Sequence, residues 1–523
     1  MPHIPFGQRV LEHEPPSRSF ADLFDELRRG WRRIDREPLL RALIEQLHRK
    51  ETTDAVTYAL DARARGTMDF VNRTLLLWVL ADGHVYEGQK KPPDAKAVQR
   101  LLQITWELSA SKNALRPIQD SPFLALRNMA VQQFSSQEFL LESTVGRNWH
   151  IFTALPANHR LRQLIESTSG IPLENAISFV LLLSSASIHT HGARLRSTIF
   201  QYARNAFNVH TRLRDMLLAH DGGSLRAQIR VEYTQEEIFA PTPFFRYPLI
   251  QLSNEVCVVD PACAGKTAEN FPTQIVVELG DERHKKALTE LYEQYANRRV
   301  NEVFPHGAYV GDQLKKLVTG RVCDQFVRIG PTCVLLVEIK SGTLADHKSA
   351  SLSGDRLFNV LEGILKEGIV QLLSTRASLL DRRLIQAADR TYMLLVTREN
   401  YRLPSNKFLR NIMPKLASTI GERLDDDAWD SLFVCCLDEF DELLDLHATG
   451  TLSLSHFFSD AATEGEHPLR SKTGLGGRLR SAKRAHVAPH LRAAYDTAAT
   501  HCGLLLNDMK AAHERADEQA ITP

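Results

Sequence analysis

The chain has 523 residues, and because hydrophobic cores stop growing at about 250 to 300 residues, we expect more than one domain. Hydrophobic residues make up 43% of the chain and charged residues 24%, which excludes the composition of a disordered protein. The 64 Lys and Arg residues almost balance 63 Asp and Glu residues. A formal net charge of +1 gives no global attraction for a polyanion, so any nucleic-acid site must be local.

The cellular compartment is indicated by the cysteines and the apolar segments. The seven cysteines are few for this length, odd in number and mostly in apolar segments of the sequence, which is unlike a secreted disulfide framework. The first twenty residues contain no apolar stretch of the kind a secretory signal needs. The longest apolar run, 176–188, is shorter than the roughly 20 residues that span a bilayer, so we interpret it as a buried helix. The sequence therefore predicts a cytoplasmic protein that does not enter a membrane.

Residues from about 21 to 220 carry apolar side chains at spacings of three and four, which predicts an all-helical N-terminal region covering 1–230. We expect Gly30 to end or kink the first of these helices, because glycine weakens a helix interior. The sequence HDGGS favours a boundary near 220–235. Residues 231–281 are predicted to be a connector that contains a β-hairpin around the turn Ser253–Asn254.

At residue 282 the pattern of apolar residues changes to alternating helices and strands, which predicts a mixed α/β domain covering 282–446. Its expected elements, in chain order, are a helix at 282–299, two strands at 322–329 and 332–339, a helix at 357–380, a strand at 391–397, helix at 405–424 and a strand at 431–437. Residues 447–523 are predicted to form a basic and helical C-terminal extension. The run 469–492 in this extension carries seven Lys and Arg residues and no acid, and it suits either a phosphate-binding surface or a solvated tail.

The segment GRVCDQFVRIGPTCVLLVEIKSG, residues 320–342, places three charged side chains at the ends of two predicted strands. Gly330 and Pro331 have the composition of a hairpin turn between these strands. If the turn centres on Pro331, Asp324 faces Glu338, and directly opposed residues hold their Cβ atoms about 4.5 to 5.5 Å apart. Lys340 shares the side of Glu338, because strand side chains alternate with a period of two. The sequence therefore predicts one site formed by all three residues.

The residue types at this site favour phosphodiester hydrolysis. Two carboxylates that share a partly buried site repel each other unless a cation lies between them. Hard oxygen ligands suit Mg²⁺ or Mn²⁺, which readily take a phosphate oxygen as a further ligand. A lysine beside them can hold or deprotonate the attacking water, or neutralise charge that develops on the phosphorus.

Asp324, a spacer and then Glu338, Ile339 and Lys340 resemble the D…(D/E)xK motif of the PD-(D/E)xK nuclease superfamily, although Cys323 stands where that family often has proline. The resemblance covers about residues 282–440 and implies a restriction-endonuclease-like α/β core, made of a helix, a three-stranded meander, a helix and a further strand. It also implies the functional residues. The metal ligands would be Asp324, Glu338, the backbone carbonyl of Ile339, and Glu293 on the first helix.

In the same family Lys340 would position the attacking water, and a polar residue on the following helix would assist catalysis. That helix offers Lys366 and Gln371, of which we select Gln371. The hypothesis is then a Mg²⁺- or Mn²⁺-dependent endonuclease that cuts DNA, or less favoured RNA, to give a 5′-phosphate. Analogy points to bacterial restriction or anti-phage defence, with DNA repair as the second role. The helical region would serve as regulator, target sensor or surface for a homo-oligomer or a partner protein.

Two alternatives stay open for the motif. The chain can be a non-catalytic nucleic-acid-binding or scaffolding protein whose nuclease fold is degraded. The simplest interpretation is a surface ion pair between Glu338 and Lys340, with Asp324 a solvated strand start.

Two further patterns are weighed and assigned structural roles. The segment DPACAGKT at 260–267 resembles the end of a phosphate-binding loop, but Asp260 stands where the first glycine is required, so an ATPase is rejected. Four arginines surround Trp31, which can stack on a base, although a structural role is the favoured interpretation.

Overall fold

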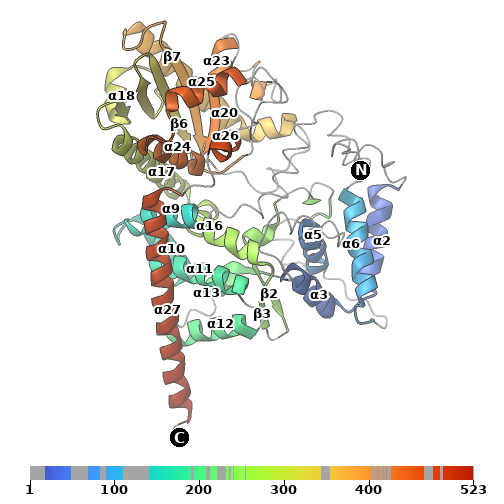
Figure 1. The fold of residues 1–523 in the computed structure, drawn as a ribbon. Helices are drawn as coiled ribbons and strands as arrows, with labels where there is room; N and C mark the ends of the chain where they lie inside the picture. The colour runs from blue at the N-terminus through green and yellow to red at the C-terminus, as the bar shows by residue number, and fades with distance from the viewer. Residues whose placement is uncertain are drawn as a thin grey trace.

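The computed structural model describes most of the chain, with gaps. The described residues are 18–48, 69–82, 90–109, 141–189, 194–207, 212–220, 231–234, 237–238, 241–253, 255–342, 354–401, 426–464, 475–482 and 487–521, together with the single positions 403, 409, 410, 416, 418 and 420. They form a mixed α/β fold with a helical N-terminal region (Figure 1).

The N-terminal region is helical throughout its described part, as predicted, up to the two-residue strand β1. Its helices are α2 (Phe20–Arg32), α3 (Arg36–His48), α5 (Asp69–Ala81), α6 (Ala95–Ser109), α9 (Leu141–Thr153), α10 (Arg160–Ser169), α11 (Leu173–His189), α12 (Arg194–Phe207) and α13 (Arg212–Leu217). The apolar run predicted as a buried helix lies in α11, and its residues 176–183 are almost entirely buried. Among the described helices none alone is long and apolar enough to cross a membrane; α10 and α11 meet that requirement only as a pair bent by 55°.

Gly30 does not end the first helix, and the expected kink at this residue stays a prediction. The helix α2 continues through Gly30 to Arg32, and a Cβ atom added at Gly30 would lie only 2.7 Å from Leu101 Cδ2 of α6. The glycine therefore serves close packing between two helices. Trp31 is only 4% exposed and its Nε1 donates a hydrogen bond of 2.8 Å to Asp82 Oδ2, so its ring is not available to a base and the structural interpretation is confirmed.

A small sheet follows, made of β1 (Leu218–Ala219), β2 (Leu249–Leu252) and β3 (Glu255–Val258), with the short 3-10 helix η1 (Pro243–Phe245) before β2. The predicted hairpin is confirmed as the antiparallel pair β2–β3. The helix α16 (Pro261–Leu279) comes next and was not expected from the sequence. Asp260 caps it, accepting from the Ala262 N–H at 2.9 Å, and its other oxygen accepts from Arg73 Nε at 2.6 Å. The segment DPACAGKT is therefore the start of a helix.

The α/β part contains a five-stranded sheet in the order β4–β5–β6–β7–β8. Its elements are α17 (Glu282–Val303), β4 (Ala308–Val310), α18 (Asp312–Leu317), β5 (Gln325–Gly330), β6 (Cys333–Lys340), α20 (Gly354–Asp381), β7 (Arg390–Thr397), α23 (Asp426–Asp430), β8 (Leu432–Cys436), α24 (Leu437–Ala448), α25 (Leu454–Glu464), α26 (Leu475–Ala482) and α27 (Pro489–Ile521). The strands β4, β5 and β6 form an antiparallel meander, and β7 and β8 continue it in parallel with β6. Every element predicted here that lies in described residues is present; the helix at 405–424 falls largely outside them.

Helices cover both faces of this sheet. Buried side chains along β6 and β7 therefore alternate between two hydrophobic cores, one on each face. Val334 and Leu336 of β6 pack with Leu365 and Ile369 of α20 in one core. Leu335, Val337 and Ile339 lie in the second core, which also contains apolar residues of α17 and α24. Side chains at even positions of β6 therefore point toward α20, and this face receives Glu338 and Lys340.

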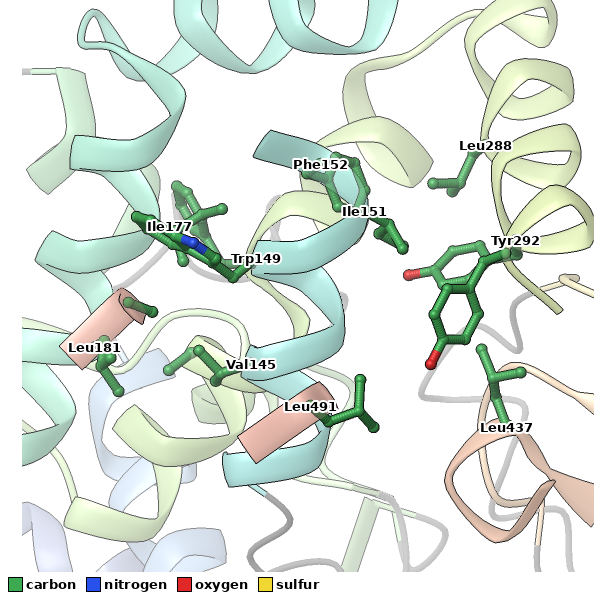
Figure 2. Close-up of a cluster of buried hydrophobic side chains, with 14 of the residues drawn as sticks. Val145, Trp149, Ile151, Phe152, Ile177, Leu181, Leu288, Tyr292, Leu437 and Leu491 are labelled. Carbon is green, nitrogen blue, oxygen red and sulfur yellow. The ribbon is translucent and has the colours of Figure 1, made fainter. Parts of the chain in front are cut away.

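The helical and α/β parts share a hydrophobic core, and the helix α9 lies in the middle of it (Figure 2). Figure 2 shows Val145 and Trp149 of α9 beside Ile177 and Leu181 of α11, and Ile151 on the side of Leu288 and Tyr292 of α17. The long helix α27 runs along α9, α11 and α12 (Figure 1). This core contains residues from all four predicted segments, so the boundaries at 230, 281 and 446 stay predictions.

The basic run 469–492 is only partly described. Residues 475–482 form α26, residues 489–492 begin α27, and the segments 469–474 and 483–486 lie outside the described residues.

A pair of glycine substitutions tests the packing of α9 on α27. A Cβ atom at Gly146 would overlap the Leu491 carbonyl oxygen, whereas one at Gly503 meets nothing within 4 Å. We expect Gly146→Ala to lower the free energy of unfolding by about 1 to 3 kcal/mol through overpacking. Gly503→Ala, also within a helix, should raise it by about 0.5 to 1 kcal/mol. Urea unfolding measures both changes, and a stabilising Gly146→Ala would contradict the packing described.

Candidate active site

The register of the β5–β6 hairpin is the one that the sequence analysis requires. Gln325 pairs with Val337 and Phe326 with Leu336, and an irregularity near the turn leaves this register unchanged at the far end. Asp324 lies in a bend one residue before β5, and continuing the register by one step would place it opposite Glu338; its Oδ2 accepts from the N–H of Ile339, the residue after Glu338. The two carboxylates that the motif singled out meet where β5 begins and β6 nears its end.

Glu338, Lys340 and Gln371 form a connected group on the face covered by α20. Lys340 Nζ lies 2.7 Å from Glu338 Oε1 and donates a second bond of 2.7 Å to Gln371 Oε1. The Gln371 amide in turn donates to the Val322 carbonyl at 3.4 Å, just before Asp324. The lysine side chain is thus held between a buried carboxylate and a helix residue, and the selected residue Gln371 belongs to the group.

Asp324 is fixed by the backbone around it. Its Oδ2 accepts a hydrogen bond of 2.7 Å from the Ile339 N–H, and its own carbonyl accepts one of 2.9 Å from the Gly311 N–H. The carbonyl of Lys340 accepts a hydrogen bond from the N–H of Arg398, the residue after β7. Because successive carbonyls of a strand point to opposite sides, the Ile339 carbonyl points toward the Asp324 side, beyond the last β5–β6 pair.

Glu293 lies on α17, and two hydrogen bonds, one on each side of Glu293 along the helix, fix α17 against the sheet. One turn before it, the Thr289 hydroxyl bonds to the Ser341 hydroxyl at 2.6 Å. One turn after it, Asn297 Oδ1 accepts from Gln325 Nε2 at 3.0 Å. Residues four apart share a helix face, so Glu293 lies between these two contacts and faces the end of the sheet. The negative charge of Asp324 raises the pKa of Glu293.

A glycine on α20 brings the helix close to these residues. A Cβ atom added at Gly368 would lie 2.6 Å from Leu395 Cδ1 and 3.5 Å from both Glu338 Cγ and Lys340 Cε. The backbone of α20 can therefore cover Glu338 closely, which contributes to its exclusion from water.

Burial raises the pKa of all three carboxyl groups. The pKa of Glu338 rises to about 8 through burial and the nearby Asp324, although Lys340 acts in the opposite direction. The pKa of Glu293 rises to about 7, again through burial first and Asp324 second. Burial also raises the pKa of Asp324, against the Ile339 N–H and Lys340. Near neutral pH the site therefore retains protons that a divalent cation would displace.

The residues present fit a small hard cation. Glu338 is 1% exposed, and its Oε2 has no hydrogen-bond partner among the described residues. A buried carboxylate oxygen without a donor is costly unless a cation binds it. As placed, no three His, Cys, Asp or Glu side chains within the described ranges converge into a ready metal-binding group. Mg²⁺ does not require one, because it keeps several waters and is held by one or two carboxylates. Asp324, Glu338 and the Ile339 carbonyl are the groups positioned to hold it.

The ion pair between Glu338 and Lys340 is present, but its location on the surface is contradicted, because Glu338 is 1% exposed. Asp324 is half-buried and hydrogen-bonded to the Ile339 N–H, so it is not simply a solvated strand start. The supporting contacts of Thr289, Asn297, Gln325 and Ser341 were not predicted. Polar residues at four-residue spacing around Glu293 were the available signal for the two on α17. Comparisons of the chain with models of known protein families, with curated proteins and with solved structures found no match.

The raised pKa of Glu338 predicts a pH dependence of stability for the protein in a chelator. Between pH 4.5 and about 8 the folded state binds more protons than the unfolded chain, so the free energy of unfolding falls as pH rises. Glu338→Gln should remove much of this decline and melt at a higher temperature than the unchanged protein at pH 8. Glu282→Gln, at an exposed position of α17, is the matched control. Equal slopes of melting temperature against pH for all three proteins would contradict the assignment.

Proposed function

We propose that the chain is a Mg²⁺-dependent nuclease of the PD-(D/E)xK kind, with the restriction-endonuclease-like core in residues 282–446. The observation that carries the proposal is the convergence of Asp324, Glu338 and Lys340 at one end of the β5–β6 pair, with one buried Glu338 oxygen left without a donor. A site built only for stability would not bury two carboxylates together. The arrangement is what hydrolysis of a phosphodiester requires.

The order of elements supports the same proposal. The helix α17, the meander β4–β5–β6, the helix α20 and the strand β7 come in the order that the resemblance implies, with the short helix α18 as an addition between β4 and β5. The acidic residue expected on the first helix is Glu293, and the polar residue expected on the following helix is Gln371, in contact with Lys340. These positions come from separate elements, so a chance match of the three-residue motif alone does not explain them.

Each residue has a role that its surroundings allow. Asp324, Glu338 and the Ile339 carbonyl would hold the cation, and Glu293 would add a ligand or orient a water. The cation, when bound, polarises the phosphate and lowers the pKa of a water. Lys340, which lies beside Glu338, would place its charge next to the attacking water and the phosphate. Gln371 keeps the Lys340 ammonium group in position through its Oε1 atom.

A cleavage assay tests the proposal. Plasmid, linear duplex, single-stranded DNA and RNA are incubated with Mg²⁺, with Mn²⁺ and with a chelator. We expect divalent-cation-dependent cleavage of at least one of them, DNA before RNA. Glu338→Ala and Lys340→Ala should each lower the rate by about 10² to 10⁴, the range for losing an acid–base group.

Matched controls come from another ion pair. Glu37 and Arg41 form a pair at 2.9 Å on α3, away from the site, and replacing either by alanine should leave the cleavage rate unchanged. Cleavage that persists in both Glu338→Ala and Lys340→Ala would refute the site assignment. If the protein cuts none of these substrates, a nucleic-acid-binding or scaffolding protein with a degraded nuclease fold is favoured.

A further inference from the structure

Tyr309 is an exposed aromatic residue on the edge strand of the five-stranded sheet. Its side chain is 43% exposed, whereas its neighbour Val310 is buried on the opposite face. Its ring lies against Phe326 of β5, with ring centroids 5.9 Å apart, and Phe326 is almost entirely buried. The tyrosine is therefore supported from below by the core and open to solvent above.

The register places this ring beside the proposed active site. Tyr309 pairs with Phe326, so Asp324 is its diagonal neighbour on the same face of the sheet. Diagonal neighbours across an antiparallel pair lie about 7 to 8 Å apart, within reach of an aromatic side chain. A nucleotide whose phosphate lies at Asp324 would thus carry its base into the vicinity of Tyr309.

The corner that carries Tyr309 is fixed, and it exposes two lysines beside one aspartate. The Gly311 N–H donates to the Asp324 carbonyl, and Gly311 has a φ of +51°, a conformation that suits glycine and turns the chain from β4 into α18. Lys315 of α18 is 64% exposed and pairs with Asp312 at 3.5 Å, and its charge acts to lower the pKa of both Glu293 and Asp324. Lys316 is exposed beside it. Aromatic rings interleaved with lysines are the composition of surfaces that bind single strands.

We propose that Tyr309 stacks on an unpaired base next to the phosphate held at Asp324 and Glu338, so that the substrate is single-stranded or locally unpaired nucleic acid. This inference rests on the proposed nuclease function and names its substrate class. Inside a duplex both faces of each base are covered by neighbouring bases, so a side chain finds a free face only on an unstacked base. Lys315 and Lys316 supply the contacts to the flanking phosphates, which do not depend on sequence.

Binding is measured by fluorescence anisotropy with labelled single-stranded DNA, single-stranded RNA and duplex DNA of the same length. All variants carry Lys340→Ala to prevent cleavage. Tyr309→Ala should weaken binding of the single strands by about five- to 150-fold, the range for one base–aromatic stack, and leave duplex binding unchanged. Tyr309→Leu keeps an apolar contact with Phe326 but has no ring, and it should lose affinity in the same way. Tyr309→Phe should retain it. Trp106→Ala removes another exposed aromatic residue, 36% exposed on α6, and should change nothing.

The outcomes separate this inference from the nuclease proposal. Equal single-strand affinity with and without the Tyr309 ring overturns the inference, even if the unchanged protein cuts DNA. An equal loss for single strands and duplex also overturns it, because Tyr309 would then be a general contact. A protein that binds none of the three nucleic acids overturns the inference as well. Ring-dependent binding of single strands in a protein that cuts nothing supports the inference and refutes the nuclease proposal.

Discussion

The arrangement depends on one constraint, the burial of the Glu338 carboxylate opposite Asp324. Burial and the nearby Asp324 raise the pKa of Glu338, and Lys340 reaches only one oxygen of Glu338. The register of the β5–β6 pair sets this encounter, and the close approach of α20 at Gly368 keeps water from it. Natural proteins accept such local destabilisation at functional sites, where the missing charge is supplied by a ligand.

The helix α17 connects the site with the helical region. One of its faces presents Glu293 to the carboxylates, and the other carries Tyr295, whose hydroxyl donates to Asp441 at 2.9 Å. Asp441 also accepts from Arg147 Nε of α9 at 3.0 Å, within a buried junction between the two parts of the chain. An unpaired charge in such a junction is costly, so α9, α17 and α24 are held in one arrangement. The third acidic residue is consequently positioned by segments far from it in sequence.

The sequence predicted the parts of the site that depend on strand periodicity. The turn at Pro331 and the alternation along β6 were enough to bring Asp324 opposite Glu338, because register fixes every side chain of a strand at once. Gln371 was selected through the resemblance, and its contact with Lys340 agrees with that choice.

Other features could not be predicted because their signals are weak or nonlocal. The helix α16 contains Pro272 in its interior and begins with a proline and a glycine-containing stretch, which conceals its helical period. The strand β4 has three residues, too few for a pattern of alternation. The role of Gly30 could not be predicted because a glycine inside α2 is explained by the close approach of Leu101, a contact between helices that are distant in sequence.

The central claim is that the buried carboxylates form a divalent-cation site, and anomalous diffraction from crystals soaked in Mn²⁺ tests it most directly. The account predicts one manganese peak within about 2.0 to 2.5 Å of carboxylate oxygens of both Asp324 and Glu338 and of the Ile339 carbonyl. A well-ordered site with no peak there, and with the Glu338–Lys340 ion pair intact, would contradict the account.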